Sequence, residues 1–285
     1  MKRKILLIAM LFLTTNIIAQ LPATFTLKAM NAEYGAAYGV AVGADGTVFL
    51  ANEGDGLRAY SYNGTSFTNT AHIDNGGTAL GVAVGLDGTV FLANRIDGLR
   101  AYSYNGTSFT NTAHINDGDS ANSVAEGVAV GADGTVFLAN GGDGLRAYSY
   151  NGTSFTNTAH INDGDWPLDV AVGSNGTIFL ANGGDGLRAY SYNDTSFTNT
   201  AHVNDGGIAN AVAVGPDGTV FLANDYDGLR AYKKYNGTSF PNAAHIDVSV
   251  SALGVAVGPD GTVFLASEEG MFAYEYSVYA GIDDN

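Results

Sequence analysis

The strongest constraint on this chain is an internal repeat. A Val-Ala-Val-Gly core recurs at spacings of 42 to 46 residues and ends at Gly43, Gly85, Gly131, Gly173, Gly215 and Gly258. Each core is followed by a nearly constant string, such as Asp-Gly-Thr-Val-Phe-Leu-Ala-Asn at 87–94 and Asp-Gly-Leu-Arg-Ala-Tyr at 97–102. Periods of this length are typical of architectures in which each structural unit packs on the next one.

Each repeat predicts four short β-strands. The segments are rich in Val, Phe, Tyr and Thr and show no helical period of 3.6 residues. In the second repeat the expected strands are 81–85, 90–94, 99–104 and 108–115. Asp-Gly and Asn-Gly between them predict two-residue turns with both central residues at positive φ. Four antiparallel strands in a repeat of this length form one blade, so the sequence predicts an all-β, six-bladed β-propeller.

The ends of the chain predict how the ring closes. Five of the six repeats contain a fourth-strand phenylalanine, and the last repeat lacks one. Phe25 precedes Gly43 by 18 residues, the same offset that separates Phe67 from Gly85. We therefore expect an N-terminal strand at 23–31 to complete the last blade, 254–277. This pairing would cover a sheet edge that could otherwise aggregate.

The first 19 residues resemble a secretory signal peptide. Lys2, Arg3 and Lys4 precede an apolar run from Ile5 to Leu13, and Ala19 fits the cleavage position. The alternative, a transmembrane anchor, needs about 20 apolar residues, and this run is shorter. We expect cleavage after residue 19, a single domain at 20–285, and a secreted or periplasmic protein that does not insert into a membrane.

Composition excludes several classes of function. The chain has no cysteine, which excludes a disulfide scaffold, a thiolate metal site and a cysteine nucleophile. Its formal net charge is −16 and becomes −19 without the three basic residues of the leader. A nucleic-acid partner is not expected, because binding a phosphate backbone requires a basic surface.

The repeat strings Gly-Val-Ala-Val-Gly, Asp-Gly-Thr-Val-Phe-Leu-Ala-Asn and Asp-Gly-Leu-Arg-Ala-Tyr resemble LVIVD-type and NHL-type bacterial propeller repeats. The resemblance covers nearly the whole mature chain. It implies the propeller fold and says little about activity, because those families include binding, scaffold and some enzymatic members.

Two repeated side-chain patterns predict framework rather than catalytic roles. Every histidine occupies the same position on strand four, about 14 Å outward of strand one at three steps of about 4.7 Å, so histidines of different blades cannot share a metal. They are His72, His114, His160, His202 and His245. Five repeats also carry an Asp three residues before an Arg, from Asp55/Arg58 to Asp227/Arg230. The last repeat lacks both, which indicates that the two side chains pair as a structural clasp.

The variable segments predict a ligand-binding face. The connections between strands two and three and between blades differ among repeats, and in an up-and-down blade they emerge on one face. Binding residues concentrate in such loops, although loops also diverge simply for lack of constraint. The candidates are Trp166, Tyr34, Tyr38, Tyr226, Arg95 and Asp165. We expect a monomeric, non-catalytic module that recognises an extracellular glycan, protein or small molecule.

The alternative is an enzyme with a divalent cation at the channel mouth. Glu126, Asp169 and Asn210 stand just before or at the start of three successive inner strands, and such oxygen ligands suit Ca²⁺ or Mg²⁺. The set resembles that of gluconolactonase-type propellers, which implies metal-dependent lactonase-like or lyase-like chemistry. Asp169 is offset by one residue, however, which places it on the opposite face of its strand. No other cofactor is expected.

Overall fold

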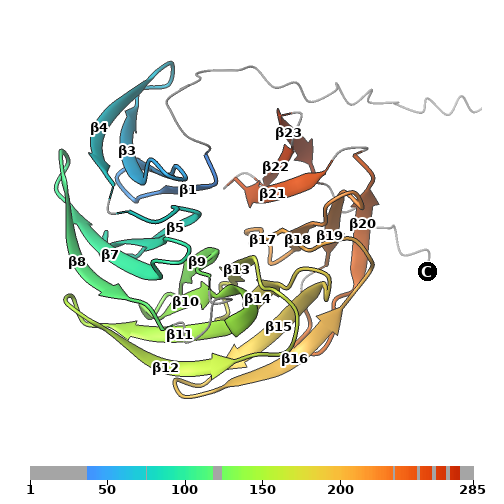
Figure 1. Ribbon diagram of the computed structural model, residues 1–285. Helices are drawn as coiled ribbons and strands as arrows, with labels where there is room; N and C mark the ends of the chain where they lie inside the picture. Colours follow the sequence, from blue (N-terminus) through green and yellow to red (C-terminus); the bar gives the residue numbers. More distant parts are fainter. Residues whose placement is uncertain are drawn as a thin grey trace, which may run out of the picture.

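A computed structural model describes residues 37–74, 76–117, 124–233, 235–248, 251–258, 261–267 and 270–276. Strands dominate, and one short 3₁₀ helix, η1 (Gly141–Asp143), interrupts them. The sheets are arranged around a centre, with the first strand of each sheet innermost (Figure 1). The fold is a six-bladed β-propeller. No helix in the described ranges is long and apolar enough to span a membrane.

Five blades have four antiparallel strands in sequence order from the centre outward. Blade 1 contains β1 (Gly39–Val42), β2 (Val48–Ala51), β3 (Leu57–Tyr62) and β4 (Phe67–Ile73). Blade 2 contains β5 (Gly81–Val84), β6 (Val90–Ala93), β7 (Leu99–Tyr104) and β8 (Phe109–Ile115). Blade 3 contains β9 (Gly127–Val130), β10 (Val136–Ala139), β11 (Leu145–Tyr150) and β12 (Phe155–Ile161).

Blade 4 contains β13 (Asp169–Val172), β14 (Ile178–Ala181), β15 (Leu187–Tyr192) and β16 (Phe197–Val203). Blade 5 contains β17 (Ala211–Val214), β18 (Val220–Ala223), β19 (Leu229–Tyr232) and β20 (Asn242–Ile246). The last blade has three described strands, β21 (Ala252–Val257), β22 (Thr262–Ser267) and β23 (Gly270–Glu275). The predicted fold class and the four-stranded repeat are thus confirmed.

The hairpin turns differ from the prediction. After Val42, Gly43 N–H bonds to the Thr47 carbonyl, and Gly46 N–H bonds to the Gly43 carbonyl. Gly46 has a φ of +83°, while the preceding Asp45 has a negative φ. The loop is therefore the three-residue type, a type I turn followed by one left-handed residue, and only that residue requires glycine. The expectation of two positive φ values was wrong.

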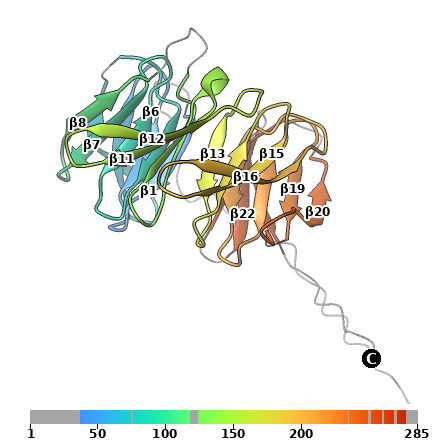
Figure 2. The ribbon, with the colours of Figure 1, turned by 90° about the horizontal axis from the view of Figure 1, so that it is seen from below.

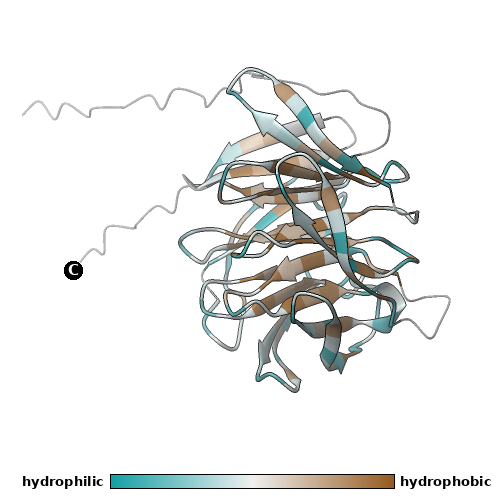
Figure 3. Ribbon diagram, turned by 90° about the vertical axis from the view of Figure 1, so that its left-hand side faces the viewer, coloured by the Kyte–Doolittle hydropathy of each residue, from teal (hydrophilic) through white to brown (hydrophobic). Residues whose placement is uncertain are grey.

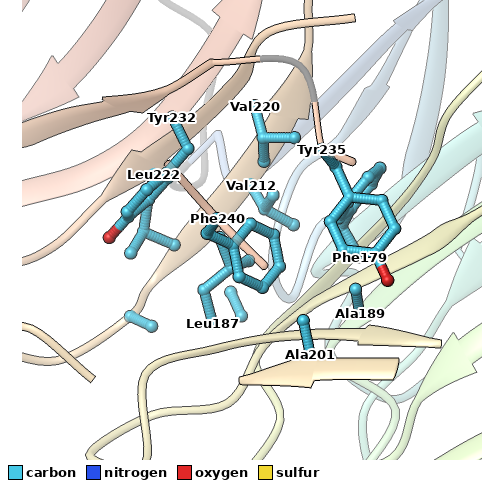
Figure 4. Packing of buried hydrophobic residues seen from close by; sticks show 12 residues of the cluster. Phe179, Leu187, Ala189, Ala201, Val212, Val220, Leu222, Tyr232, Tyr235 and Phe240 are labelled. Atoms are coloured by element: carbon cyan, nitrogen blue, oxygen red, sulfur yellow. The ribbon is translucent and has the colours of Figure 1, made fainter. Parts of the chain in front are cut away.

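The core lies between consecutive blades. One sheet face contributes small and aromatic side chains such as Phe49 and Ala51, and the facing sheet contributes Val82, Leu92 and Tyr102. Similar clusters join the other consecutive blades from 2 to 6. Figure 4 shows the cluster between blades 4 and 5, in which Phe179 and Tyr235 meet edge-on with ring centroids 5.7 Å apart. Apolar residues gather along the strands and polar residues at the turns (Figure 3).

The two ends of the ring differ from the five internal interfaces. Val40 and Val42 on β1 are 60% and 64% exposed, whereas Val82, the equivalent of Val40 on β5, is 8% exposed. Within the described ranges, no core cluster joins blade 6 to blade 1. The predicted closing strand at 23–31 and the predicted leader lie outside the described residues.

Candidate functional site

The variable loops share one face of the ring, as predicted. The loop between β2 and β3 forms a single β-bridge, Glu53 with Ala79, to the segment that precedes β5 of the next blade. The same bridge joins Arg95 with Ala125 in the following pair of blades. The β1–β2 and β3–β4 turns lie at the opposite ends of these strands, as Figure 2 shows in a view turned by 90° from Figure 1. We call the first surface the loop face and the second the turn face.

Three charged residues at one position of the β2–β3 loops and their equivalents have a left-handed backbone conformation. Glu53, Arg95 and Asp225 have φ values of +48°, +48° and +51°. Gly141 and Gly183 occupy the same position in blades 3 and 4, with φ values of +51° and +55°. A side chain in this left-handed region costs about 1 kcal/mol or more relative to glycine. The fold therefore accepts glycine here, and three blades instead place a charged side chain at this position of the loop face.

Trp166 and Glu126 are in contact on this face. Trp166 is half-buried, in the segment between blades 3 and 4, and Glu126 is half-buried just before β9. Burial raises the pKa of the Glu126 carboxyl, while hydrogen bonding from Trp166 and the charge of Arg95 partly oppose that rise. The Trp166 ring thus meets the Glu126 carboxylate, and the charge of Arg95 from blade 2 acts on that carboxylate. The sequence named all three residues but did not predict the contact between Trp166 and Glu126.

The remaining ligand candidates have different surroundings. Tyr38 and Tyr226 are 61% and 72% exposed, and Asp165 is exposed with a φ of +50°. Tyr34 lies outside the described residues. Ile96, beside Arg95 in the same variable loop, is 68% exposed.

Asp169 is the most unusual side chain near the central channel. It opens β13 at a position where β1, β5 and β9 begin with glycine. Its Oδ2 accepts the backbone N–H of Val212 from blade 5 at 3.0 Å. A Cβ placed on Gly127 would lie 2.8 Å from Asp169 Oδ1, so blade 3 packs closely against this carboxyl. Desolvation raises its pKa to about 6, against the effect of backbone hydrogen bonds from Val212 and Val170.

The three predicted cation ligands have separate partners. Asn210 donates its Nδ2–H to the Ala252 carbonyl at 2.9 Å, Glu126 contacts Trp166, and Asp169 accepts from Val212. In the described ranges no three His, Asp or Glu residues cluster closely enough to hold a metal ion. A site that combines two carboxylates with the Asn210 amide is not tested by this observation and stays a prediction.

The Asp/Arg pairs form the expected clasp in blades 1 to 5. Arg100 donates from Nε and Nη2 to Asp97 at 2.5 and 3.2 Å, and Asn94 donates to the same carboxylate at 2.8 Å. Burial would raise the pKa of Asp97, but these hydrogen bonds outweigh it and lower the pKa. His114 Nε2 bonds to the Asp97 carbonyl at 2.5 Å. The repeated histidines therefore belong to the framework, as predicted.

Sequence analysis missed a second aspartate in this network. Asp163, in the segment that leads into blade 4, accepts the Tyr190 hydroxyl at 3.1 Å and lies 3.5 Å from Arg188 Nη1. Asp205 has the same contacts with Tyr232 and Arg230 at 3.0 and 3.3 Å. The recurring Asn-Asp-Gly after strand four was the sequence signal. These aspartates tie the connecting segments to the blades that follow them.

Comparisons with known proteins support the fold. No protein-family model and no curated protein matches the sequence. A solved protein from Lactobacillus plantarum is similar with a TM-score of 0.75 and 15% identity, over 86% of this chain and 82% of that one. A streptogramin B lyase has a TM-score of 0.65 and 12% identity, over 85% of this chain and 83% of that one.

A catalytically inactive virginiamycin B lyase variant from Staphylococcus aureus, solved with quinupristin, has a TM-score of 0.64 and 11% identity, over 86% and 85% of the two chains. At these identities the likeness shows the propeller fold alone. The resemblance to LVIVD-type and NHL-type repeats is supported only at that level.

Proposed function

We propose that this protein is a secreted, non-catalytic binding module whose loop face holds an extracellular ligand that presents a cationic group. The observation that carries the proposal is the contact between the Trp166 ring and the Glu126 carboxylate. An indole ring beside carboxylates binds an ammonium or guanidinium group through cation–π and charge attraction. The chain's net charge of −16 favours such a partner over an anionic one.

Other aromatic and charged side chains on the loop face also suit a binding site, and the blades of the propeller hold them on a rigid support. The exposed rings of Tyr38 and Tyr226 lie on the same face, and aromatic side chains contribute large contact areas in recognition. Arg95 occupies a strained backbone position that glycine fills in two other blades. Retaining such strain is typical of functional positions.

The single tryptophan provides the test. We expect a tetralysine peptide to shift Trp166 emission on titration, with an affinity that falls as salt is added, and a neutral oligosaccharide to leave the emission unchanged. Glu126→Gln should weaken tetralysine binding severalfold. Trp166→Ala, followed by calorimetry, should weaken it further while the melting temperature stays within a few degrees. Unchanged emission with tetralysine, or equal binding by the Glu126→Gln variant, would contradict the proposal.

The second candidate is a metal-dependent lyase-like or lactonase-like enzyme. Its support is the enclosed carboxyl of Asp169 beside the channel, on a fold shared with proteins described as lyases. Asp169, Glu126 and Asn210 would hold a Ca²⁺ or Mg²⁺ ion, which would polarise a substrate oxygen. Calorimetric titration with Ca²⁺ separates the two candidates. If the protein is the enzyme, the parent should bind the ion and the Asp169→Asn variant should not, whereas the binding module requires no ion.

A further inference from the structure

The turn face retains the same side chains from blade to blade, although the loop face of the same repeats has diverged. Part of this constancy is explained by turn geometry. Asn105 Oδ1, for example, accepts the Thr107 and Ser108 backbone N–H groups at 3.0 and 2.9 Å, which holds the β7–β8 turn. Other constant residues on this face, such as Ser61 and Ser103, are exposed and have no such role in a turn.

A cavity lies among these residues between blades 1 and 2. Its volume is about 450 Å³, and it is lined by Asp45, Thr47, Ser61 and Thr70 of blade 1 and by Tyr104 and Asn105 of blade 2. The lining combines four hydroxyl groups with a carboxylate and an amide. It contains no cationic side chain.

The floor of the cavity is a hydroxyl pair that joins the two blades. The Thr70 and Tyr104 hydroxyls lie 2.5 Å apart, and the Tyr104 hydroxyl also donates to the Gly106 carbonyl at 2.7 Å. The pair recurs at the next three blade interfaces with distances of 2.5, 2.6 and 2.5 Å, as Thr112–Tyr150, Thr158–Tyr192 and Thr200–Tyr235. The same pair of threonine and tyrosine hydroxyls therefore joins the blades at four successive interfaces.

One lining residue has no evident structural reason to be retained. Ser61 is exposed, its hydroxyl has no hydrogen-bond partner within the described ranges, and it faces the exposed Thr68 across the β3–β4 pair. Serine has no particular preference for strands. Yet an exposed serine stands at this position in blades 2, 3 and 4, as Ser103, Ser149 and Ser191. Blade 5 replaces it with Lys233, so the fold does not require serine there.

We propose that the turn face binds neutral saccharides in the groove between blades 1 and 2 and in three related grooves, one at each interface from blades 2–3 to blades 4–5. Hydroxyl, amide and carboxylate groups on a rigid surface form hydrogen bonds with sugar hydroxyls, and the acidic chain disfavours anionic sugars. Each groove is shallow and binds weakly alone. Four grooves on one rigid ring bind a surface with many copies of the sugar far more tightly, because each later contact is intramolecular.

The experiment uses the whole protein and four immobilised conjugates that carry mannose, galactose, N-acetylglucosamine or sialic acid. We expect retention on at least one of the three neutral conjugates, none on sialic acid, and release by the free neutral sugar. Calorimetry with that free sugar should give a stoichiometry near four. Ser103→Arg should lower the retained fraction severalfold, and the same change at Ser61, Ser103, Ser149 and Ser191 together should abolish retention.

Control variants separate this site from the loop face. Leu86→Arg changes a side chain that is 87% exposed and does not line the cavity, and it should bind as the parent does. Trp166→Ala should also leave saccharide retention unchanged, even if it abolishes tetralysine binding. No retention on any neutral conjugate, full retention by the fourfold serine variant with an unchanged melting temperature, or loss of retention in Trp166→Ala would each overturn the proposal.

Discussion

The carboxyl of Asp169 should destabilise the folded protein at neutral pH. Most inner strands begin with glycine or alanine, whereas β13 places this carboxyl in the narrow centre of the ring. Part of the residue's surface remains in contact with the channel, but protein encloses its charged group. The pKa of about 6 reflects that enclosure, because desolvation disfavours the ionised form. Asp169→Asn keeps the shape and an acceptor for Val212 N–H, and removes the charge.

The expected magnitude follows from the shift in pKa. The folded value of about 6 lies roughly 2 units above that of an aspartate in an unfolded chain, and each unit is worth about 1.4 kcal/mol. Because the carboxyl pKa is raised in the folded protein, the free energy of unfolding is greatest at a pH where the group is protonated in both the folded and the unfolded chain. The free energy of unfolding falls as the pH rises from about 4 to about 6, and ionisation of Asp169 costs ~3 kcal/mol at neutral pH.

Urea unfolding across this pH range provides the assay. At about pH 8 the Asp169→Asn variant should be more stable than the parent by up to ~3 kcal/mol, and near pH 4 the difference should vanish. Asp97→Asn is the control of opposite sign, because the Asp97 pKa is lowered and its loss should destabilise the protein most at neutral pH. An Asp169→Asn variant that is no more stable than the parent at about pH 8 would refute the reasoning.

The other predictions concern the clasp, the ring closure and the loop strain. A double-mutant cycle with Asp143→Ala and Arg146→Ala should show coupling of about 0.5–1 kcal/mol in urea unfolding, and zero coupling would count against a structural pair. Deleting 20–31 should cause aggregation or a large fall in melting temperature by scanning calorimetry, whereas an unchanged monomer would show that the ring closes in another way. Arg95→Gly should leave the melting temperature equal or higher, since it relieves a left-handed backbone, and should strengthen tetralysine binding in the emission assay, because it removes a positive charge near Glu126.

The sequence was sufficient for the architecture because each repeat carries local signals that agree with one another. Strand residues, turn residues and a constant period all indicated the same four-stranded blade, and the shared loss of Asp and Arg in the last repeat predicted their pairing. The turn type was mispredicted because Asp-Gly fits more than one hairpin loop. The extra hydrogen bond from Gly46 N–H, which selects the three-residue form, depends on the register of the strands.

The candidate site could be predicted only as a set of residues. Trp166 and Glu126 are 40 positions apart, and their contact depends on how the segment between blades 3 and 4 folds back over the ring. The surroundings of Asp169 could not be predicted either. Its position relative to the start of its strand differs by one residue from that of Glu126, which the sequence shows. Its enclosure, however, results from the close approach of Gly127 and Val212 in the neighbouring blades.

Asp169 also bears on which candidate function is correct. The same position is glycine in β1, β5 and β9, so the propeller does not need a carboxylate there, and ionising it costs stability. Sequences that retain a locally unfavourable group commonly do so at functional positions. A cationic ligand that reaches the channel mouth would stabilise the ionised form and lower this pKa. Binding of either a basic ligand or a metal ion should therefore release a proton near pH 6, but only the binding of the basic ligand should weaken in the Trp166→Ala variant.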